Sequence, residues 1–378
     1  MKISWRYKMY RKLLLIVFLI IVLSGCTKEP DTIRIGVAGP MTGDQAKMGM
    51  DFRNGVTLAM EEWNSQGGIL GKTIELLIED DQRDPKQAVS IANKLVNQKV
   101  IGIIGHFNSS CSIPASDIYD RAGIPMITPA STNPQFTDRG YAGVFRVCGR
   151  DDQQGKVAAE FIVSKLKIKK IAVIHDKTTY GQGLADELKK FLGDMAEVVY
   201  YGGVVQGDKD FKAVLTAIKN AKPELVFFGG IYPEAGLLVK QAKEIGLKTP
   251  FMSGDGVIDP QFIEIAGNKA AEGTYLTFSP DPGKIPSAKM FIDKYRQRFG
   301  EPGPYSIYAY DAMNILLTAI ENAETTDGKK VIANLHSNEF SGALDKIKFD
   351  AKGDVTAAPY VVWITKDGTF TEYWKPQQ

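Results

Sequence analysis

IRIGVAGPMTGDQAKMGMDFRNGVTLAMEEWNSQGG, residues 33–68, is the stretch that decides the fold. Apolar residues alternate over 33–37, as they do in a strand. From Met48 to Trp63 they recur every three or four residues, the spacing of a helix that buries one face, and Gly67-Gly68 ends that helix. A strand followed by an amphipathic helix is the repeating unit of an α/β protein.

The same unit recurs along most of the chain. Strands are expected over 73–79, 100–105, 124–128, 170–174, 198–201, 225–228, 250–252 and 275–278. Helices are expected from Asp84-Pro85 onward, between the third and fourth strands, and over 183–192, 211–220, 233–245, 287–299 and 306–323. Lys366-Asp367-Gly368 indicates a C-terminal hairpin. This order predicts two doubly wound lobes, each a mostly parallel sheet covered on both faces.

The N-terminus indicates export. Five basic and no acidic residues lie in the first 25, around an apolar run over 13–22 that ends in Leu23-Ser24-Gly25-Cys26. Such a run makes about 16 Å of helix, about half of a bilayer's hydrocarbon core, which favours a cleaved signal over a retained anchor. Residues 23–26 also resemble the lipobox of bacterial lipoproteins. We expect a signal peptide over 1–25, lipidation of Cys26 and a tether over 26–31, with the folded body outside the cytoplasmic membrane.

Composition narrows the function. The chain has 378 residues, enough for two domains, and beyond its first 25 residues it holds 41 basic against 44 acidic residues. Nucleic acid is therefore not an expected partner. No metal site is expected, because His106, His175 and His336 have no ligand-like spacing. Cys111 and Cys148 could form a disulfide or remain separate buried thiols.

Enzyme motifs are incomplete. Residues 67–73 look like a phosphate loop, but Gln66 stands where its first glycine belongs and a strand follows instead of a helix. Gly181-Gln182-Gly183 begins a dinucleotide fingerprint, yet Asp186 replaces its third glycine. We find no nucleophile paired with a base, and we expect a protein that is not an enzyme and has no cofactor.

Five loops at predicted strand ends are rich in small and hydroxylic residues. In open α/β sheets such loops bind ligands. Helix N-termini and hydroxyls suit a carboxylate, and an aspartate suits an ammonium group, so these loops fit a small zwitterion. The loops span residues 105–110, 128–133, 175–181, 229–234 and 253–256.

Several of these segments resemble the periplasmic leucine/isoleucine/valine-binding protein family, the type I solute-binding components of branched-chain amino-acid ABC transporters. The resemblance is carried by residues 84–89 (DPKQAV), 114–119 (PASDIY), 127–130 (ITPA), 175–177 (HDK) with 180–181 (YG), 246–249 (GLKT) and 271–273 (AEG). It implies the type I periplasmic-binding-protein fold, an α/β fold of two doubly wound parallel-sheet lobes joined by a hinge of short crossovers. We expect lobe one over 32–148 and 279–358, and lobe two over 149–278 and 359–378.

The resemblance also implies a ligand site. Ser109, Ala130 and Thr132 would hold the α-carboxylate and share in holding the ammonium group, Tyr180 would close on that head group, and Asp255 would pair with the ammonium. The side-chain pocket would be shaped by Met48, Phe107, Tyr305 and Tyr232. The family commonly has a tyrosine directly after the Gly-Gly pair, where this chain has Ile231 followed by Tyr232.

Each site residue also has a purely structural interpretation. Ser109 and Thr132 could cap helices, Tyr180 and Tyr305 could be core aromatics, and Asp255 could be a turn residue. The N-terminal signal and the lipobox-like residues 23–26 predict an exported, lipid-anchored protein. The family resemblance implies that it captures an amino acid, most simply a branched-chain aliphatic one, and delivers it to ABC permease subunits. The alternative is a sensory module that binds another amino acid or amide and signals to a membrane partner.

Overall fold

The computed structural model describes residues 32–376, and its elements follow the predicted alternation of strands and helices. The predicted signal peptide, the lipidation site Cys26 and the tether lie outside the described residues. From Ile33 onward the chain forms a single unit that contains two large sheets.

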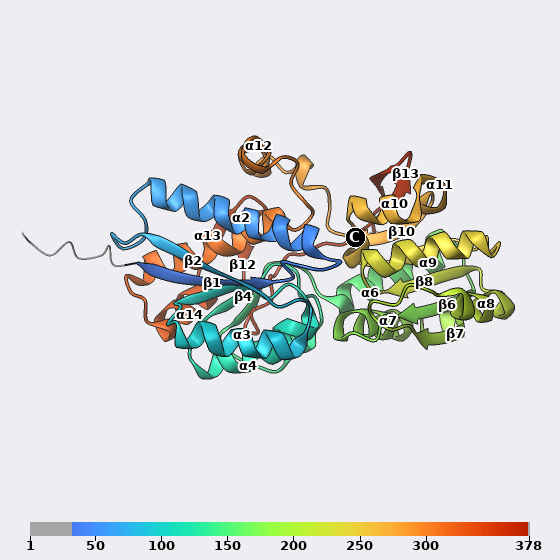
Figure 1. Cartoon of the computed structure of the whole chain (residues 1–378), viewed down its shortest axis with the longest axis horizontal. Helices are drawn as coiled ribbons and strands as arrows, with labels where there is room; N and C mark the ends of the chain where they lie inside the picture. Colours follow the sequence, from blue (N-terminus) through green and yellow to red (C-terminus); the bar gives the residue numbers. More distant parts are fainter. Residues whose placement is uncertain (1–31, 377–378) are drawn as a thin grey trace, which may run out of the picture. The chain divides into compact units, whose positions relative to one another are not determined.

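The first sheet has five parallel strands in the order β2-β1-β3-β4-β5: β1 (Ile33–Gly39), β2 (Ile74–Asp80), β3 (Gly102–Gly105), β4 (Met126–Thr128) and β5 (Val144–Arg146). One face is covered by α2 (Ala46–Ser65) and α13 (Ser306–Ala323), the other by α3 (Pro85–Asn97) and α4 (Ser109–Arg121) (Figure 1). Ile35 and Val37 pack into the core on the α2 side, whereas Ala38 packs into the core on the α3 side. Both faces of β1 are therefore buried, as expected of a strand inside a parallel sheet.

The second sheet has the order β14-β13-β10-β9-β8-β6-β7. Its parallel strands are β6 (Lys170–His175), β7 (Glu197–Gly203), β8 (Leu225–Gly229), β9 (Phe251–Ser253) and β10 (Tyr275–Phe278). Its antiparallel edge is formed by β13 (Val361–Lys366) and β14 (Thr369–Trp374), with Asp367 and Gly368 at positive φ between them. The predicted hairpin is confirmed, because positive φ at both turn residues is what a two-residue hairpin loop requires.

Helices cover both faces of the second sheet. Phe227 packs into the core with α6 (Asp151–Glu160) and α7 (Thr179–Leu192). Phe228 points the other way, into the core that includes residues of α8 (Lys212–Ala221) and α9 (Tyr232–Glu244). The predicted fold class of doubly wound parallel sheets is therefore confirmed.

Some elements have too weak a pattern to be predicted. In the hairpin of β11 (Glu339–Gly342) and β12 (Asp345–Lys348), only Phe340 and Ile347 are buried, so no apolar run marks either strand. The sequence patterns also did not predict α10 (Pro260–Ala266) or α14 (Gly328–Ser337), although both bury apolar residues, and α6 continues as a π-helical turn over Phe161–Lys165. The remaining elements are α5 (Gln135–Asp138), α11 (Asn268–Ala271), α12 (Ala288–Phe299) and the 3₁₀ turns Gly193–Met195, Asp255–Val257 and Pro282–Lys284.

Within residues 32–376 the chain passes between the two sheets three times, through segments 147–150, 279–287 and 349–360. We call these the connecting segments. They include or adjoin the predicted lobe boundaries at 148, 278 and 358, which we retain as a proposal for where the lobes divide.

Cys111 and Cys148 are both buried and free. Cys111 is a residue of α4 and lies in the core between that helix, α3 and the first sheet, whereas Cys148 lies in the core on the α13 side. Of the two alternatives left open by the sequence, the structure has separate thiols.

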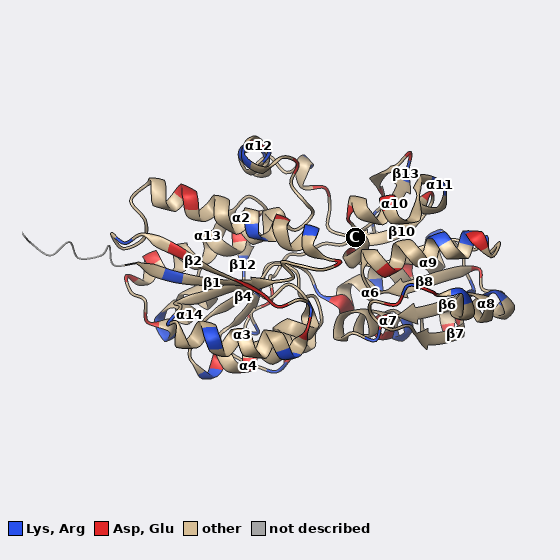
Figure 2. Ribbon diagram, in the orientation of Figure 1, with Lys and Arg blue, Asp and Glu red and all other residues tan. Residues whose placement is uncertain are grey.

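Charges of both signs are interspersed over the helices of both sheets (Figure 2). Many form surface ion pairs, such as Lys94 with Glu79 and Lys294 with Glu62, both at 2.7 Å. Among residues 32–376, no helix combines the length and apolarity needed to cross a bilayer.

Candidate ligand-binding site

A small pocket, about 20 Å³ in volume, is formed where loops leave the carboxyl ends of β3, β4, β6, β8 and β9. Six of the predicted site residues line it: Phe107, Ser109, Ala130, Tyr180, Asp255 and Tyr305. Gln45, Asn108, Ile231 and Gly256 complete the wall. Residues from loops of both sheets therefore meet at one point, as the rule for open α/β sheets predicts.

One wall is the start of helix α4. Ser109 is the first residue of this 13-residue helix and is buried, and Asn108 precedes it in extended conformation. The first N–H groups of a helix have no partner within the helix and carry a partial positive charge. This wall therefore suits an anionic group such as a carboxylate.

The loop after β4 is held firmly beside α4. Arg146, fully buried, donates to the carbonyl oxygens of Ser131 at 2.7 Å and Asn133 at 3.1 Å. Ser131 Oγ in turn donates to the carbonyl oxygen of Phe107 at 2.9 Å. These bonds join the two loops that carry Ser109 and Ala130.

Thr132 lies in this loop but does not line the pocket. Its side chain is fully buried, and its hydroxyl lies near Asp151, where it lowers the pKa of that acid against the effect of burial. Thr132 does not cap the helix that follows it, because the N-cap of that helix, Gln135–Asp138, is Pro134.

The opposite wall presents the carboxylate of Asp255, which is 2% exposed. Its Oδ1 accepts from Tyr180 Oη at 2.7 Å and from Gln154 Nε2 at 3.1 Å. Its Oδ2 accepts from Tyr305 Oη at 2.7 Å. Tyr305 precedes α13 of the first sheet, so this last bond joins the two lobes.

Burial dominates the electrostatics here. It raises the pKa of Asp255, against the lowering effect of the bonds from Tyr305, Tyr180 and Gln154. Burial and the charge of Asp255 raise the pKa of Tyr180 and of Tyr305 well above the usual value, so both phenols stay protonated donors.

A second buried acid stands close by. Burial, and then the charge of Asp255, raises the pKa of Asp151 well above its usual value. Gln154 Nε2 bridges the two acids, at 3.1 Å from each of Asp151 Oδ1 and Asp255 Oδ1. Asp151 Oδ2 is buried and has no hydrogen-bond partner among the described residues. This wall therefore favours a positively charged group.

Two predicted pocket residues do not line the pocket. Met48 is buried in the core of the first lobe, where Gln45 Nε2 donates to its sulfur at 3.7 Å. Tyr232 donates from Oη to the carbonyl oxygen of Asp44 at 2.6 Å, which joins α9 to the first lobe. Ile231, the residue directly after the Gly-Gly pair, faces the pocket instead. The predicted roles of Met48 and Tyr232 in the side-chain pocket stay predictions.

Some contributors were not singled out from the sequence. Asn108 lies in the predicted ligand loop 105–110, next to Ser109, so its position in the sequence already indicated that it could line the pocket. Gln45 and Gln154 had no such signal. Gln154 lies on α6, whose apolar pattern is weak, and it reaches Asp255 across 101 residues of sequence.

Two doubly wound lobes that enclose a polar pocket define a type I periplasmic binding protein, a class that captures solutes. Residues 32–369 match the family model described as periplasmic binding protein. The chain is 45% identical to a Pseudomonas aeruginosa "amino acid binding protein" over 359 residues, 94% of this chain and 96% of the relative. It is 43% identical to Leu/Ile/Val-binding protein homolog 2 of Brucella abortus, over 93% of this chain and 95% of the relative.

The fold agrees with these relatives. The crystal structure of the leucine binding protein LivK from Thermotoga maritima superposes with a TM-score of 0.85 at 32% identity, covering 91% of this chain and 99% of that one. The chain therefore belongs to the leucine/isoleucine/valine-binding protein family of periplasmic binding proteins. Its members are exported solute-binding proteins of transporters, and so is this one.

Proposed function

We propose that this protein captures a branched-chain aliphatic amino acid between its lobes and delivers it to an ABC permease. The observation that carries the proposal is the buried Asp255 carboxylate, whose hydrogen-bond partners are phenols and an amide, opposite the start of helix α4. A zwitterion places an ammonium and a carboxylate on one carbon, so it complements both walls at once. The names of the relatives support this ligand class.

We assign the head group to five residues. Ser109, Ala130 and Thr132 hold the α-carboxylate and share in holding the ammonium group; Ser109 and Ala130 line the pocket, and Thr132 follows Ala130 in the same loop. Asp255 pairs with the ammonium group, and Tyr180 closes on the head group from the second lobe. Charge-assisted bonds of this kind contribute roughly 1.5–3 kcal/mol each, so they dominate the affinity for the whole ligand class.

Discrimination among amino acids is left to apolar residues. Phe107 and Tyr305 meet edge-on with ring centroids 5.1 Å apart, next to Ile231. We propose that a leucine-sized side chain packs against these residues. Each buried methylene contributes about 0.8 kcal/mol, so three carbons more than alanine favour leucine by on the order of 2 kcal/mol.

Capture works through closure of the lobes. Direct bonds between the lobes exist outside the pocket: Asn133 Nδ2 donates to the Thr179 carbonyl at 2.7 Å, and Lys209 pairs with Asp44 at 2.8 Å. A ligand that bonds both walls adds contacts that only the closed form offers, and so shifts the population toward closure. The closed form then docks to the permease, and the ligand leaves chemically unchanged.

We further propose that Cys26 carries a lipid that anchors the mature protein at the membrane. The support is the lipobox-like LSGC sequence at 23–26 behind an apolar run. Expression with a radiolabelled fatty acid should label the unaltered protein and leave Cys26→Ala unlabelled. Equal labelling of both would exclude Cys26 as the acceptor.

The ligand proposal is tested by a thermal-shift screen of ligand-stripped protein against the amino acids. At a concentration of 100 times Kd, a ligand that binds only the folded state stabilises it by about 2.7 kcal/mol. Leucine, isoleucine and valine should raise the melting temperature, and D-leucine serves as the control. A protein that responds to no L-amino acid would refute the proposal.

A further inference from the structure

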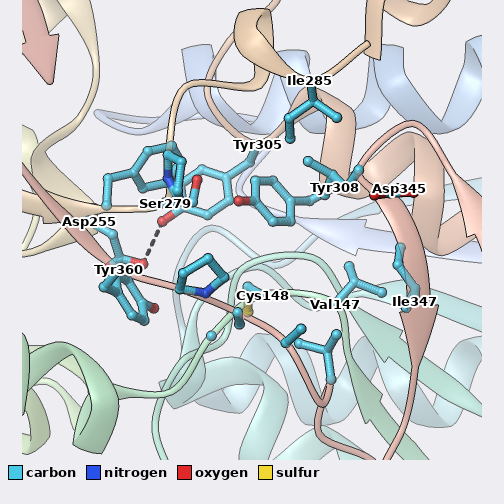
Figure 3. Close-up of a pocket in the computed structure, with 18 of the residues that line it drawn as sticks. Val147, Cys148, Asp255, Ser279, Ile285, Tyr305, Tyr308, Asp345, Ile347 and Tyr360 are labelled. Atoms are coloured by element: carbon cyan, nitrogen blue, oxygen red, sulfur yellow. Dashed lines mark hydrogen bonds between the residues drawn. The ribbon is translucent and has the colours of Figure 1, made fainter. Parts of the chain in front are cut away.

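A second and larger cavity lies directly behind the ligand pocket. Its volume is about 300 Å³, and all three connecting segments contribute to its lining, together with α13 and the β11–β12 hairpin (Figure 3). Most of the lining is apolar, and includes Val147, Phe278, Ile285, Tyr308 and Ile347. We call it the hinge cavity. A dry cavity of about 150 Å³ already admits benzene, so this one has room for an indole ring.

Two residues line both cavities: Tyr305 and Asp255. Figure 3 shows the hydrogen bond between them at the edge of the hinge cavity. Tyr305 is 4% exposed, and its ring lies edge-on to Phe107 on the ligand side and to Phe278 on the hinge side, at centroid distances of 5.1 and 5.6 Å. The tyrosine ring is therefore the partition between the two spaces.

The bond that fixes this partition involves the carboxylate that the ligand needs. Tyr305 Oη donates a hydrogen bond to Asp255 Oδ2, whereas Tyr180 Oη and Gln154 Nε2 donate to Oδ1. An arriving ammonium group competes with the Tyr305 phenol for Oδ2, because it is the stronger, charged donor. The edge-on contacts with Phe107 and Phe278 then hold the Tyr305 ring in place.

We propose that Tyr305 is a specificity-determining residue that sets the upper size of the ligand by closing off the hinge cavity. With the ring in place, only the space next to Phe107 and Ile231 is open to the ligand side chain, and a bicyclic side chain is rejected. Without the ring, the hinge cavity becomes an extension of the pocket, and a tryptophan side chain can enter it. This inference rests on the proposed capture of amino acids, and it identifies Tyr305 as the residue that limits the size of the amino-acid side chain.

The test compares the affinities for leucine and tryptophan by isothermal titration calorimetry. In the unaltered protein we expect tryptophan to bind at least 100-fold more weakly than leucine. Tyr305→Ala should narrow this ratio by at least 30-fold, through tighter tryptophan binding and weaker leucine binding. Tyr305→Leu keeps more of the apolar packing and should also narrow the ratio of leucine to tryptophan affinity. This variant replaces Tyr305→Ala in the test if the alanine variant does not fold.

Two further variants isolate the partition. Ile347→Ala enlarges the hinge cavity but does not open it to the ligand, because Ile347 lines the hinge cavity and not the ligand pocket, so the ratio of the two affinities should stay unchanged. Tyr305→Phe keeps the ring and loses the bond to Asp255, so tryptophan should still be rejected.

An unchanged ratio in both Tyr305→Ala and Tyr305→Leu, or an equal gain in tryptophan affinity in Ile347→Ala, would overturn the inference. So would an unaltered protein that binds tryptophan as well as leucine. These outcomes differ from failure of the proposed function, in which the unaltered protein binds neither ligand.

Discussion

Asp255→Asn should weaken amino-acid binding without unfolding the protein. The change keeps the shape of the side chain and an oxygen acceptor for Tyr180 and Gln154, but it removes the charge that pairs with the ammonium group. A charge-assisted bond contributes roughly 1.5–3 kcal/mol, so affinity for leucine should fall by about 10- to 150-fold. Isothermal titration calorimetry measures this loss, and urea denaturation of the ligand-free protein should show a change of about 1 kcal/mol or less.

Asp259→Asn is the matched control. Asp259 is a buried aspartate four positions further on, which accepts from Gln261 N at 2.9 Å at the start of α10 and does not line the pocket. Asparagine caps helices as well as aspartate does, so leucine affinity should be unchanged. If Asp255→Asn bound leucine as tightly as this control, the assignment of the ammonium group to Asp255 would be wrong.

The same carboxylate predicts a pH dependence. Burial raises the pKa of Asp255, and the ammonium group binds the ionised form, so binding must displace any proton held there. Leucine affinity should therefore fall as the solution is acidified, beginning above pH 4, where an exposed aspartate would still be ionised. Asp255→Asn should remove this part of the pH dependence, and a profile identical in both proteins would contradict the reasoning.

Three further predictions follow from neighbouring groups. Ser109→Ala should weaken leucine binding about 5-fold, because the ligand loses one neutral hydrogen bond; if calorimetry shows no change in affinity, Ser109 does not contact the ligand. Arg146→Met should destabilise the fold by roughly 1–3 kcal/mol in urea denaturation, because the buried carbonyl oxygens of Ser131 and Asn133 lose their donor while Asp354 keeps Arg150 as an ion-pair partner at 2.7 Å; an unchanged free energy of unfolding would refute this. Cys111 and Cys148 should both react with a thiol reagent in the unfolded, unreduced protein, and a mass two hydrogens lighter with neither labelled would show a disulfide instead.

Much of the fold was predictable because its signals are local. Alternating apolar residues predicted β1, and Asp84-Pro85 predicted the start of α3, where Asp84 Oδ1 accepts from Lys86 N at 2.7 Å. Asp367-Gly368 predicted the last hairpin for the same reason. The β11–β12 hairpin was missed because two buried residues in eight leave no periodic pattern.

The site was predictable only in part. Ser109 and Asp255 lie in loops rich in small and polar residues at predicted strand ends, which indicated a binding site. The family resemblance then predicted which ligand group each residue contacts. Whether Ile231 or Tyr232 faces the pocket depends on where α9 begins, since each step along a helix turns a side chain by about 100°. The sequence named Tyr232, and the structure places Ile231 in the pocket wall.

The sequence by itself determined the alternation of strands and helices, the export signal expected at the N-terminus, and the class of ligand that the loops suit. These follow from periods of two to four residues and from side-chain chemistry, which operate over short distances along the chain. Only the tertiary structure decided that Tyr305 meets Asp255, that Gln154 bridges two buried acids, and that a cavity of about 300 Å³ lies behind the pocket. Those arrangements join residues 50 and 101 positions apart, and they depend on how the two sheets pack, which no local pattern encodes.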